Sequence, residues 1–193
     1  MEKDLRQVPS QILRVVLYGP ESTGKTTLAH ALAKHYKTEC VEEFAREYLQ
    51  KKWEEQKAVC TLEDLPLIIE GQLESENKKL AKAQRVLFCD TNVMVTKVWS
   101  ETHFNGYCDP DILHYSKKFS YDLYLLTGID IPWKKDDLRD RPNDRQLMFD
   151  HFKKTLDQHK KKYRILEGNY KTRLKKAIEV IDGFLKKFNS AFK

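Results

Sequence analysis

The sequence has few cysteines, and they are not arranged as pairs or as metal ligands. The four, Cys40, Cys60, Cys89 and Cys108, lie far apart, with no C-x-x-C pair and no nearby histidine at metal-ligand spacing. Disulfide-rich secreted domains and zinc modules carry such patterns. Their absence predicts a reduced, cytoplasmic protein without structural zinc.

Long apolar runs, repeats and linkers are missing as well. No apolar stretch reaches membrane-spanning length, and residues 1–10 are too polar for a signal peptide. There is no internal repeat, low-complexity tract or Pro/Gly-rich linker. With 33% charged and 40% hydrophobic residues, we expect one soluble domain over residues 1–193, in which residues 1–10 form a polar N-terminal extension.

The net charge of +6 comes largely from lysines near the C-terminus. One interpretation is a nucleic-acid surface. The other is that the lysines solvate the outer faces of helices whose inner faces are apolar, as in the stripe formed by Leu174, Ala177, Ile178, Ile181 and Leu185. We favour solvation, and expect neither nucleic acid nor a membrane as a partner.

One strong motif stands in YGPESTGKTTLAHAL, residues 18–32. Gly19, Gly24, Lys25 and Thr26 have the spacing of the Walker A loop, G-x-x-x-x-G-K-[ST]. Glycines let the backbone turn through positive φ and direct N–H groups at phosphate, Lys25 reaches the β- and γ-phosphates, and Thr26 joins the Mg²⁺ shell. The loop predicts binding of ATP and Mg²⁺ through Gly19, Glu21, Ser22, Thr23, Gly24, Lys25, Thr26 and Thr27.

Strand and helix patterns alternate along the rest of the chain. Apolar runs predict strands at 12–18, 38–43, 85–90, 121–126 and 163–167. Helical patterns cover 25–36, 44–59, 64–83, 92–101, 111–120, 145–162 and the final apolar stripe. The alternation predicts an α/β P-loop NTPase fold, a five-stranded parallel sheet with helices on both faces, of the nucleoside- or nucleotide-kinase type.

Ligands of such sheets bind at the carboxyl ends of the strands, where several charged groups gather. Asp90 ends an apolar strand, so it is a candidate Mg²⁺ ligand alongside Thr26; the alternative is that it caps the next helix. Glu43 and Arg46 follow the second strand. We interpret a carboxylate here, Glu43, as the acceptor of a hydroxyl proton and Arg46 as a substrate contact, against an ordinary exposed ion pair. Whether Glu43 or Asp90 is the base stays open.

The charged segment KKDDLRDRPNDR follows the fourth strand and contains a proline break. Arg139 and Arg141 are spaced to converge on phosphate from a short mobile lid, which would neutralise the transferring group and exclude water. The alternative is a surface loop whose charges pair with one another.

Taken in order, the runs GPESTGKTTLA, EEFAREYL, CDTN, TKVWSE, IPWKKDDLRDR and EGNY resemble the nicotinamide riboside kinase domain of NadR-type proteins, over about residues 11–187. The resemblance implies transfer of the ATP γ-phosphoryl group to the 5′-hydroxyl of nicotinamide riboside. It maps Lys25 and Thr26 onto ATP and Mg²⁺, and Glu43, Arg46 and Asp90 onto substrate and metal. Trp133 and Tyr170 match aromatic residues that hold the pyridine ring; alternatively they cover the edge of the core.

The chain also departs from that family. Members often read D-T-D where this chain has Asp90, Thr91 and Asn92, so a catalytic role at position 92 is not expected. The adenylyltransferase and DNA-binding domains of full-length NadR are not recognised, so neither activity is expected. Another nucleoside or small alcohol as acceptor, and an ATPase or switch without acceptor, remain alternatives. The oligomeric state is open, a homo-oligomer included.

Overall fold

The computed structural model describes residues 4–190, with side chains described as far as residue 187. Its described part contains a five-stranded sheet in the order β2-β3-β1-β4-β5, and every neighbouring pair of strands is parallel. The strands are β1 (Leu13–Tyr18), β2 (Cys40–Val41), β3 (Val86–Asp90), β4 (Leu123–Thr127) and β5 (Tyr163–Leu166). The predicted parallel sheet is therefore confirmed.

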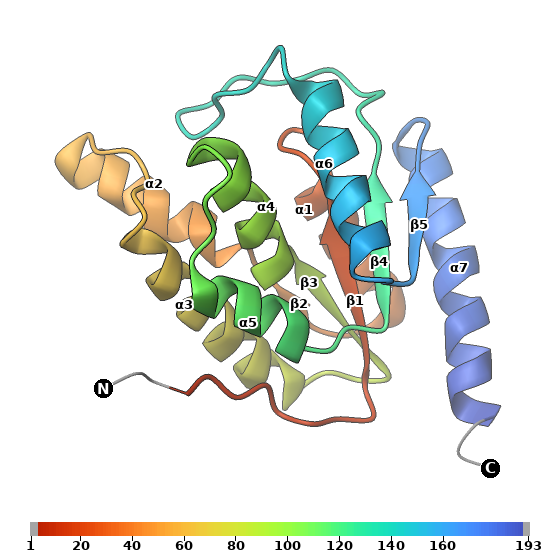
Figure 1. Cartoon of the computed structure of the whole chain (residues 1–193). Helices are drawn as coiled ribbons and strands as arrows, with labels where there is room; N and C mark the ends of the chain where they lie inside the picture. Colours follow the sequence, from red (N-terminus) through yellow and green to blue (C-terminus); the bar gives the residue numbers. More distant parts are fainter. Residues whose placement is uncertain (1–3, 191–193) are drawn as a thin grey trace.

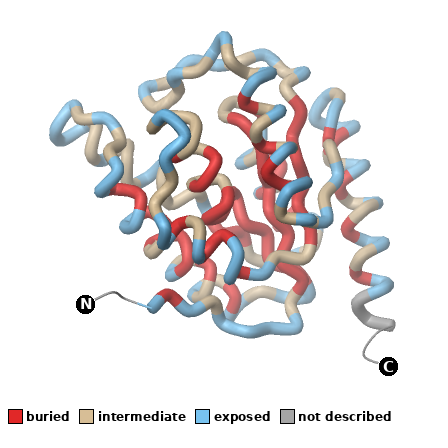
Figure 2. Tube along the Cα trace, viewed as in Figure 1, coloured by how far each residue is buried: buried red, intermediate tan, exposed pale blue. Residues whose placement is uncertain are grey.

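The central strands are continuous apolar runs because both faces of the sheet are covered. Every residue of β1, β3 and β4 is buried, as expected for strands of a parallel sheet, and the buried segments form the centre of the molecule in Figure 2. The edge strand β2 is shorter than the six residues predicted. It pairs with β3 only through Cys40 and Val41, and the chain then turns into a helix after Glu43.

Helices cover the two faces of the sheet (Figure 1). On one face, α1 (Lys25–Tyr36) and α7 (Tyr170–Ser190) contribute Leu28, Leu32 and Ile181 to the core. On the other, α4 (Val93–His103) and α6 (Arg145–Gln158) contribute Met94, Val98 and Phe152. This two-sided cover is the architecture that the alternating pattern predicts.

Three further helices form a subsidiary cluster on the β2 side of the sheet. They are α2 (Phe44–Gln56), α3 (Asp64–Leu80) and α5 (Pro110–Lys118), and α4 joins them in a third apolar cluster. Of the expected N-terminal extension, residues 1–3 lie outside the described residues. The remainder packs on this cluster, since Leu5 is buried and its N–H donates to the hydroxyl of Tyr115 at 3.2 Å.

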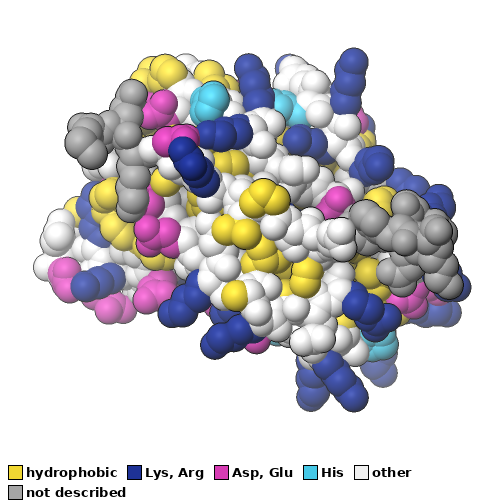
Figure 3. All heavy atoms as spheres, turned by 90° about the horizontal axis from the view of Figure 1, so that it is seen from below, with side chains coloured by type: hydrophobic (Ala, Val, Ile, Leu, Met, Phe, Trp, Pro, Cys, Tyr) yellow, Lys and Arg dark blue, Asp and Glu magenta, His cyan; other side chains and the backbone are white. Residues whose placement is uncertain are grey.

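The lysine-rich α7 is amphipathic. Ala177, Ile181 and Leu185 are buried against the sheet, with Leu174 and Ile178 packed beside them, whereas Lys175 and Lys176 are exposed. Figure 3 shows the face at the amino ends of the strands, where basic side chains lie around an apolar centre and acidic ones gather mainly on the left of the view. Among the described residues, no helix combines the length and apolar character needed to cross a membrane.

Candidate active site

A cavity of about 240 Å³ lies at the carboxyl ends of the strands. One end is formed by the Walker A loop, from Gly19 through Thr27, and the other is a chamber between α2, α3, α4 and α6. The segment between β4 and α6 contributes Leu138, Arg139 and Arg141 to the wall. The phosphate loop and the predicted lid therefore border the same space.

The loop has the backbone geometry that the two glycines predict. Gly19 and Gly24 have φ of +132° and +82°. A Cβ atom on Gly19 would lie 2.9 Å from Oγ1 of Thr127, so this position excludes other residues on steric grounds as well. Gly24 is the residue before α1. Because the following N–H groups begin that helix, the loop end favours an anion.

Asp90 is directed at the start of α1. Its Oδ2 accepts a hydrogen bond of 2.5 Å from the hydroxyl of Thr26. The helix that follows β3 is capped by Asn92 instead, whose Oδ1 accepts from the Met94 N–H at 3.2 Å. The alternative that Asp90 caps this helix is thereby excluded, and position 92 has a structural role.

The pair formed by Thr26 and Asp90 fits a hard divalent cation. Asp90 is fully buried, and its Oδ1 has no hydrogen-bond partner among the described residues. An orphaned buried carboxylate oxygen is costly unless a cation compensates it. Carboxylate and hydroxyl oxygens are the donors that Mg²⁺ accepts. These residues thus suit the predicted Mg²⁺, with both donors at the edge of the phosphate loop.

Glu43 lies two residues after β2, immediately before α2, and lines the same cavity as the phosphate loop. Gln72 of α3 fixes the turn by accepting from the Phe44 N–H at 2.9 Å and donating to the Glu42 carbonyl at 3.2 Å. Burial raises the pKa of Glu43, opposed by the charge of Lys25 and reinforced by that of Asp90. Burial likewise raises the pKa of Asp90, again opposed by Lys25. The charge of Lys25 therefore opposes the raised pKa of both carboxyl groups.

The chamber beyond Glu43 is largely apolar and includes one flat aromatic stack. Trp99 and His103, one turn apart on α4, lie with ring centroids 4.1 Å apart and planes 13° from parallel. Both line the cavity. Further apolar wall comes from Ala45, Leu49, Leu65, Ile68, Val95, Met148 and Phe152. A flat apolar ring of a ligand would find complementary surface here.

The segment between β4 and α6 is attached to α2 by charge. Asp136 accepts hydrogen bonds from Arg46 at 2.8 Å and pairs with Arg139 at 3.0 Å. Arg46 therefore pairs with the lid. The alternative of an ordinary exposed ion pair would require it to pair with Glu43 or Glu47, the carboxylates near it in the sequence, and in the described part of the chain it pairs with neither. Arg139 also donates to the Lys134 carbonyl at 2.6 Å, so its guanidinium is held within the lid.

The other end of the lid is held by the phosphate loop and by α4. Glu21 Oε1 accepts from the indole N–H of Trp133 at 3.0 Å and from the backbone N–H of Arg141 at 3.2 Å. The Arg141 guanidinium donates to the Thr102 carbonyl at 2.7 Å and to Nε2 of His103 at 3.2 Å. Both lid arginines line the cavity, but their guanidinium groups are bonded to protein.

The two aromatic residues expected to hold the pyridine ring do not line the chamber. Trp133 lies against the phosphate loop through Glu21. Tyr170 begins α7 after β5, with 47% of its surface exposed. The segment after β4 reaches the cavity wall only from Leu138 onward, because Trp133 is held beside the phosphate loop, and Tyr170 begins a helix on the opposite face of the sheet from α4 and α6. Of the tryptophans among the described residues, Trp99 is the one that lines the cavity.

Arg173 of α7 was not recognised from the sequence. It is 4% exposed, and its guanidinium donates to the carbonyl oxygens of Thr23, Gly128 and Gly168 at 2.7, 3.0 and 2.9 Å. It also pairs with Asp130. One buried side chain therefore ties the phosphate loop to the turns after β4 and β5. An arginine on an otherwise lysine-rich helix was the only signal for it.

These features define a class. A parallel sheet with a Walker A loop at its central strand, and a buried carboxylate at the end of the neighbouring strand, belongs to a P-loop nucleotide-binding protein of the nucleoside-kinase-like fold. The family follows from comparison with known sequences. A family model described as an AAA domain, AAA_28, matches residues 14–173, and the chain belongs to this family.

The chain is also similar to particular proteins. It is 24% identical over 176 residues to the trifunctional NAD biosynthesis/regulator protein NadR of Escherichia coli, covering 90% of this chain and 43% of that protein. The chain thus spans less than half the length of this relative. A crystal structure of NadR in complex with NR superposes with a TM-score of 0.74 at 23% identity, covering 91% of this chain and 52% of the other.

The nucleoside-kinase likeness extends beyond NadR. A deoxyadenosine kinase from M. mycoides superposes with a TM-score of 0.64 at 12% identity, covering 89% of this chain and all of the other. At these identities the structural matches establish the fold, as predicted, and do not by themselves assign the substrate.

Proposed function

We propose that this protein is an ATP- and Mg²⁺-dependent kinase that transfers the γ-phosphoryl group of ATP to the 5′-hydroxyl of nicotinamide riboside, giving nicotinamide mononucleotide. The observation that carries the proposal is the single cavity that joins the phosphate loop to a chamber with an aromatic wall. Glu43 and Lys25 line this cavity, and Asp90 is bonded to Thr26 of the phosphate loop. The similarity to NadR over 90% of the chain supports the choice of acceptor.

The phosphate end of the cavity is assigned to ATP. The backbone N–H groups of residues 21–27 would surround the β-phosphate, and the Lys25 ammonium would neutralise the β- and γ-phosphates. In the structure Lys25 Nζ donates to the Pro20 carbonyl at 2.7 Å, which keeps it at the loop. Thr26 and Asp90 would hold Mg²⁺, which would supply charge neutralisation at the phosphates.

Glu43 is assigned to the acceptor hydroxyl. It lies between the phosphate loop and the chamber, so a hydroxyl in the chamber can reach it. The carboxylate form accepts the hydroxyl proton as the new O–P bond forms and the bond to ADP breaks. Arg139 and Arg141 supply positive charge to the transferring group once they exchange their protein partners for phosphate. Arg46 contacts the acceptor from the α2 side.

The pyridine ring is assigned to the face of Trp99. Nicotinamide riboside carries a permanent positive charge on its ring, and a cation over an aromatic face gains about 0.5 to 2 kcal/mol. The His103 ring behind Trp99 fixes the indole plane. This assignment replaces Trp133 and Tyr170, because neither reaches the chamber that Glu43 borders. Those two residues remain candidates for contacts on the ATP side of the phosphate loop.

ADP release from ATP–Mg²⁺ with and without a panel of ribosides tests the proposal. We expect nicotinamide riboside to accelerate ADP release strongly, and uncharged uridine to do so poorly. Equal use of both would indicate a kinase with another acceptor. ADP release that no riboside accelerates would indicate an ATPase or nucleotide-driven switch instead.

A further inference from the structure

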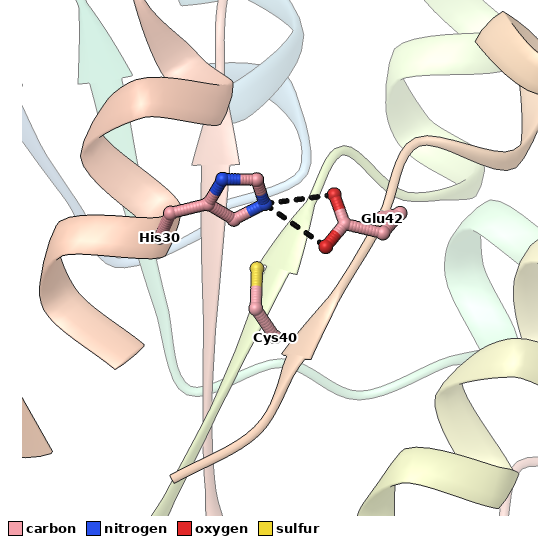
Figure 4. Close-up of side chains that lie close together, drawn as sticks. All are labelled: His30, Cys40 and Glu42. Carbon is pink, nitrogen blue, oxygen red and sulfur yellow. Dashed lines mark hydrogen bonds and ion pairs between the residues drawn. The ribbon is translucent and has the colours of Figure 1, made fainter. Parts of the chain in front are cut away.

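Three side chains with metal-ligating atoms meet outside the cavity, between α1 and the end of β2. They are His30, Cys40 and Glu42, whose ligand atoms all lie within 4.8 Å of one another. Nε2 of His30 is 2.9 Å from both carboxylate oxygens of Glu42. Figure 4 shows the sulfur of Cys40 directed toward the space beside this contact.

The fold brings these residues together although their spacing does not suggest it. His30 lies one turn after Thr26 on α1, on the side of that helix that meets β2. Cys40 is buried in the core between α1 and the sheet, and Glu42 leaves the end of the same strand. The helix and the edge strand each supply ligands, so no C-x-x-C or similar pattern appears in the sequence.

We propose that His30, Cys40 and Glu42 form a binding site for a borderline-soft divalent cation of the Zn²⁺ type, separate from the Mg²⁺ position at Asp90. An imidazole nitrogen, a thiolate and a carboxylate are the three donor types that zinc uses in proteins. Three protein ligands leave one tetrahedral position for water. The proposal of this metal site does not depend on the proposed kinase activity.

The geometry needs only a small rearrangement to reach coordination distances, in which the 2.9 Å contact between His30 and Glu42 opens slightly and the ligand atoms within 4.8 Å of one another gather around the ion. Bonds of about 2.0 to 2.3 Å place tetrahedral ligand atoms about 3.3 to 3.8 Å apart. The side chains of His30 and Glu42 are 52% and 60% exposed, so both can rotate toward the buried sulfur. Their exposure also gives the ion a path from solvent. Mg²⁺ is a poor competitor, since it prefers oxygen donors and octahedral geometry.

Metal binding at this site exchanges a proton for the cation. Burial, and then the negative charges of Glu42 and Asp90, raise the pKa of the Cys40 thiol to about 12. Cysteine binds Zn²⁺ as the thiolate, so formation of the S–Zn bond displaces the thiol proton and releases about one proton to solvent. The bound cation also neutralises the Glu42 charge. Coordination by His30 and Cys40 would also link α1 to the two-residue edge strand β2.

Co²⁺ and Zn²⁺ titrations of the chelator-treated full chain test the site. We expect one Co²⁺ per chain with a sulfur-to-cobalt charge-transfer band in the near ultraviolet, and displacement of Co²⁺ by Zn²⁺. Calorimetry of Zn²⁺ binding in buffers of different ionisation enthalpy is expected to give about one released proton. Excess Mg²⁺ is expected to leave the cobalt band unchanged.

Variants separate this site from adventitious binding. Cys40→Ser is expected to abolish the charge-transfer band, and His30→Gln and Glu42→Gln to weaken binding by about tenfold or more. His30 and Glu42 are exposed, so their variants test the site even if Cys40→Ser does not fold. His35→Gln, on the same helix, and Cys108→Ser serve as controls that keep parental affinity. Co²⁺ binding without a thiolate band, or unchanged affinity in His30→Gln and Glu42→Gln, would overturn the proposal.

Discussion

Arg173→Leu is expected to destabilise the protein and to disorder the phosphate loop. The substitution leaves the carbonyl oxygens of Thr23, Gly128 and Gly168 without their donor. Each buried acceptor left unpaired costs about 1 to 3 kcal/mol. Asp130 loses its partner too, but its side chain is 39% exposed and is rehydrated. Partial rehydration of the carbonyls brings the expected total to about 3 kcal/mol.

That cost has two measurable consequences. In a chain of this size, about 3 kcal/mol corresponds to a fall in Tm of about 6 to 12 °C, which thermal unfolding by circular dichroism measures. Because Thr23 belongs to the phosphate loop, kcat/KM for ATP is expected to fall by about tenfold or more in the folded variant. Arg173→Lys keeps the charge but cannot span three carbonyls, so it is expected to lie between.

Arg164→Leu is the matched control for this prediction. Arg164 is exposed, and its guanidinium bonds only to the carbonyl of its neighbour Tyr163 among the interactions of the described residues. A surface change of this kind is expected to alter stability by no more than about 0.5 kcal/mol. Equal stability and equal ATP kinetics in Arg173→Leu, Arg164→Leu and the parent would refute the role given to Arg173.

The remaining predictions concern the cavity. Glu43→Gln is expected to lower kcat with little change in ATP affinity, whereas Asp90→Asn raises the Mg²⁺ concentration for half-maximal rate; an exchange of the two phenotypes would reverse the assignment. Because burial raises the pKa of both carboxyl groups, and the charged forms are required, kcat is expected to fall with decreasing pH from a midpoint above the ordinary carboxyl range. Trp99→Ala is expected to raise KM for nicotinamide riboside about tenfold and leave KM for ATP within about twofold. Trp133→Ala is the paired comparison, and a larger effect of Trp133→Ala on the riboside would restore the sequence-based assignment.

The parts of the site that could be predicted from the sequence are those formed by neighbouring residues. The local sequence determines the backbone geometry at Gly19, Gly24 and Lys25, because a tight loop followed by a helix needs glycine at fixed positions. Asp90 could be found because it ends a strand that is apolar throughout. The alternation of strands and helices likewise predicts a parallel sheet, although it does not give the order of the strands.

The parts that could not be predicted depend on contacts between segments that are distant in the sequence. Trp99 lies in a helical segment after one strand, and Trp133 precedes a helical segment after another. Local pattern therefore cannot say which of the two lines the chamber. In the structure Trp99 lines the chamber, whereas Trp133 is held at the phosphate loop by its hydrogen bond to Glu21. Arg173 and the His30–Cys40–Glu42 group also join segments that are distant in sequence. Nothing in the spacing of their residues indicates such contacts.

The central claim is that phosphoryl transfer occurs at this phosphate loop with nicotinamide riboside as acceptor. The most direct measurement is the rate of nicotinamide mononucleotide formation from ATP–Mg²⁺ and nicotinamide riboside, in the parent and in Lys25→Ala, with folding of both verified by circular dichroism. Loss of one charge clamp at the transferring group is expected to cost about 3 to 4 kcal/mol, a fall in rate on the order of 10² to 10³. Near-parental product formation by a folded Lys25→Ala protein would contradict the claim.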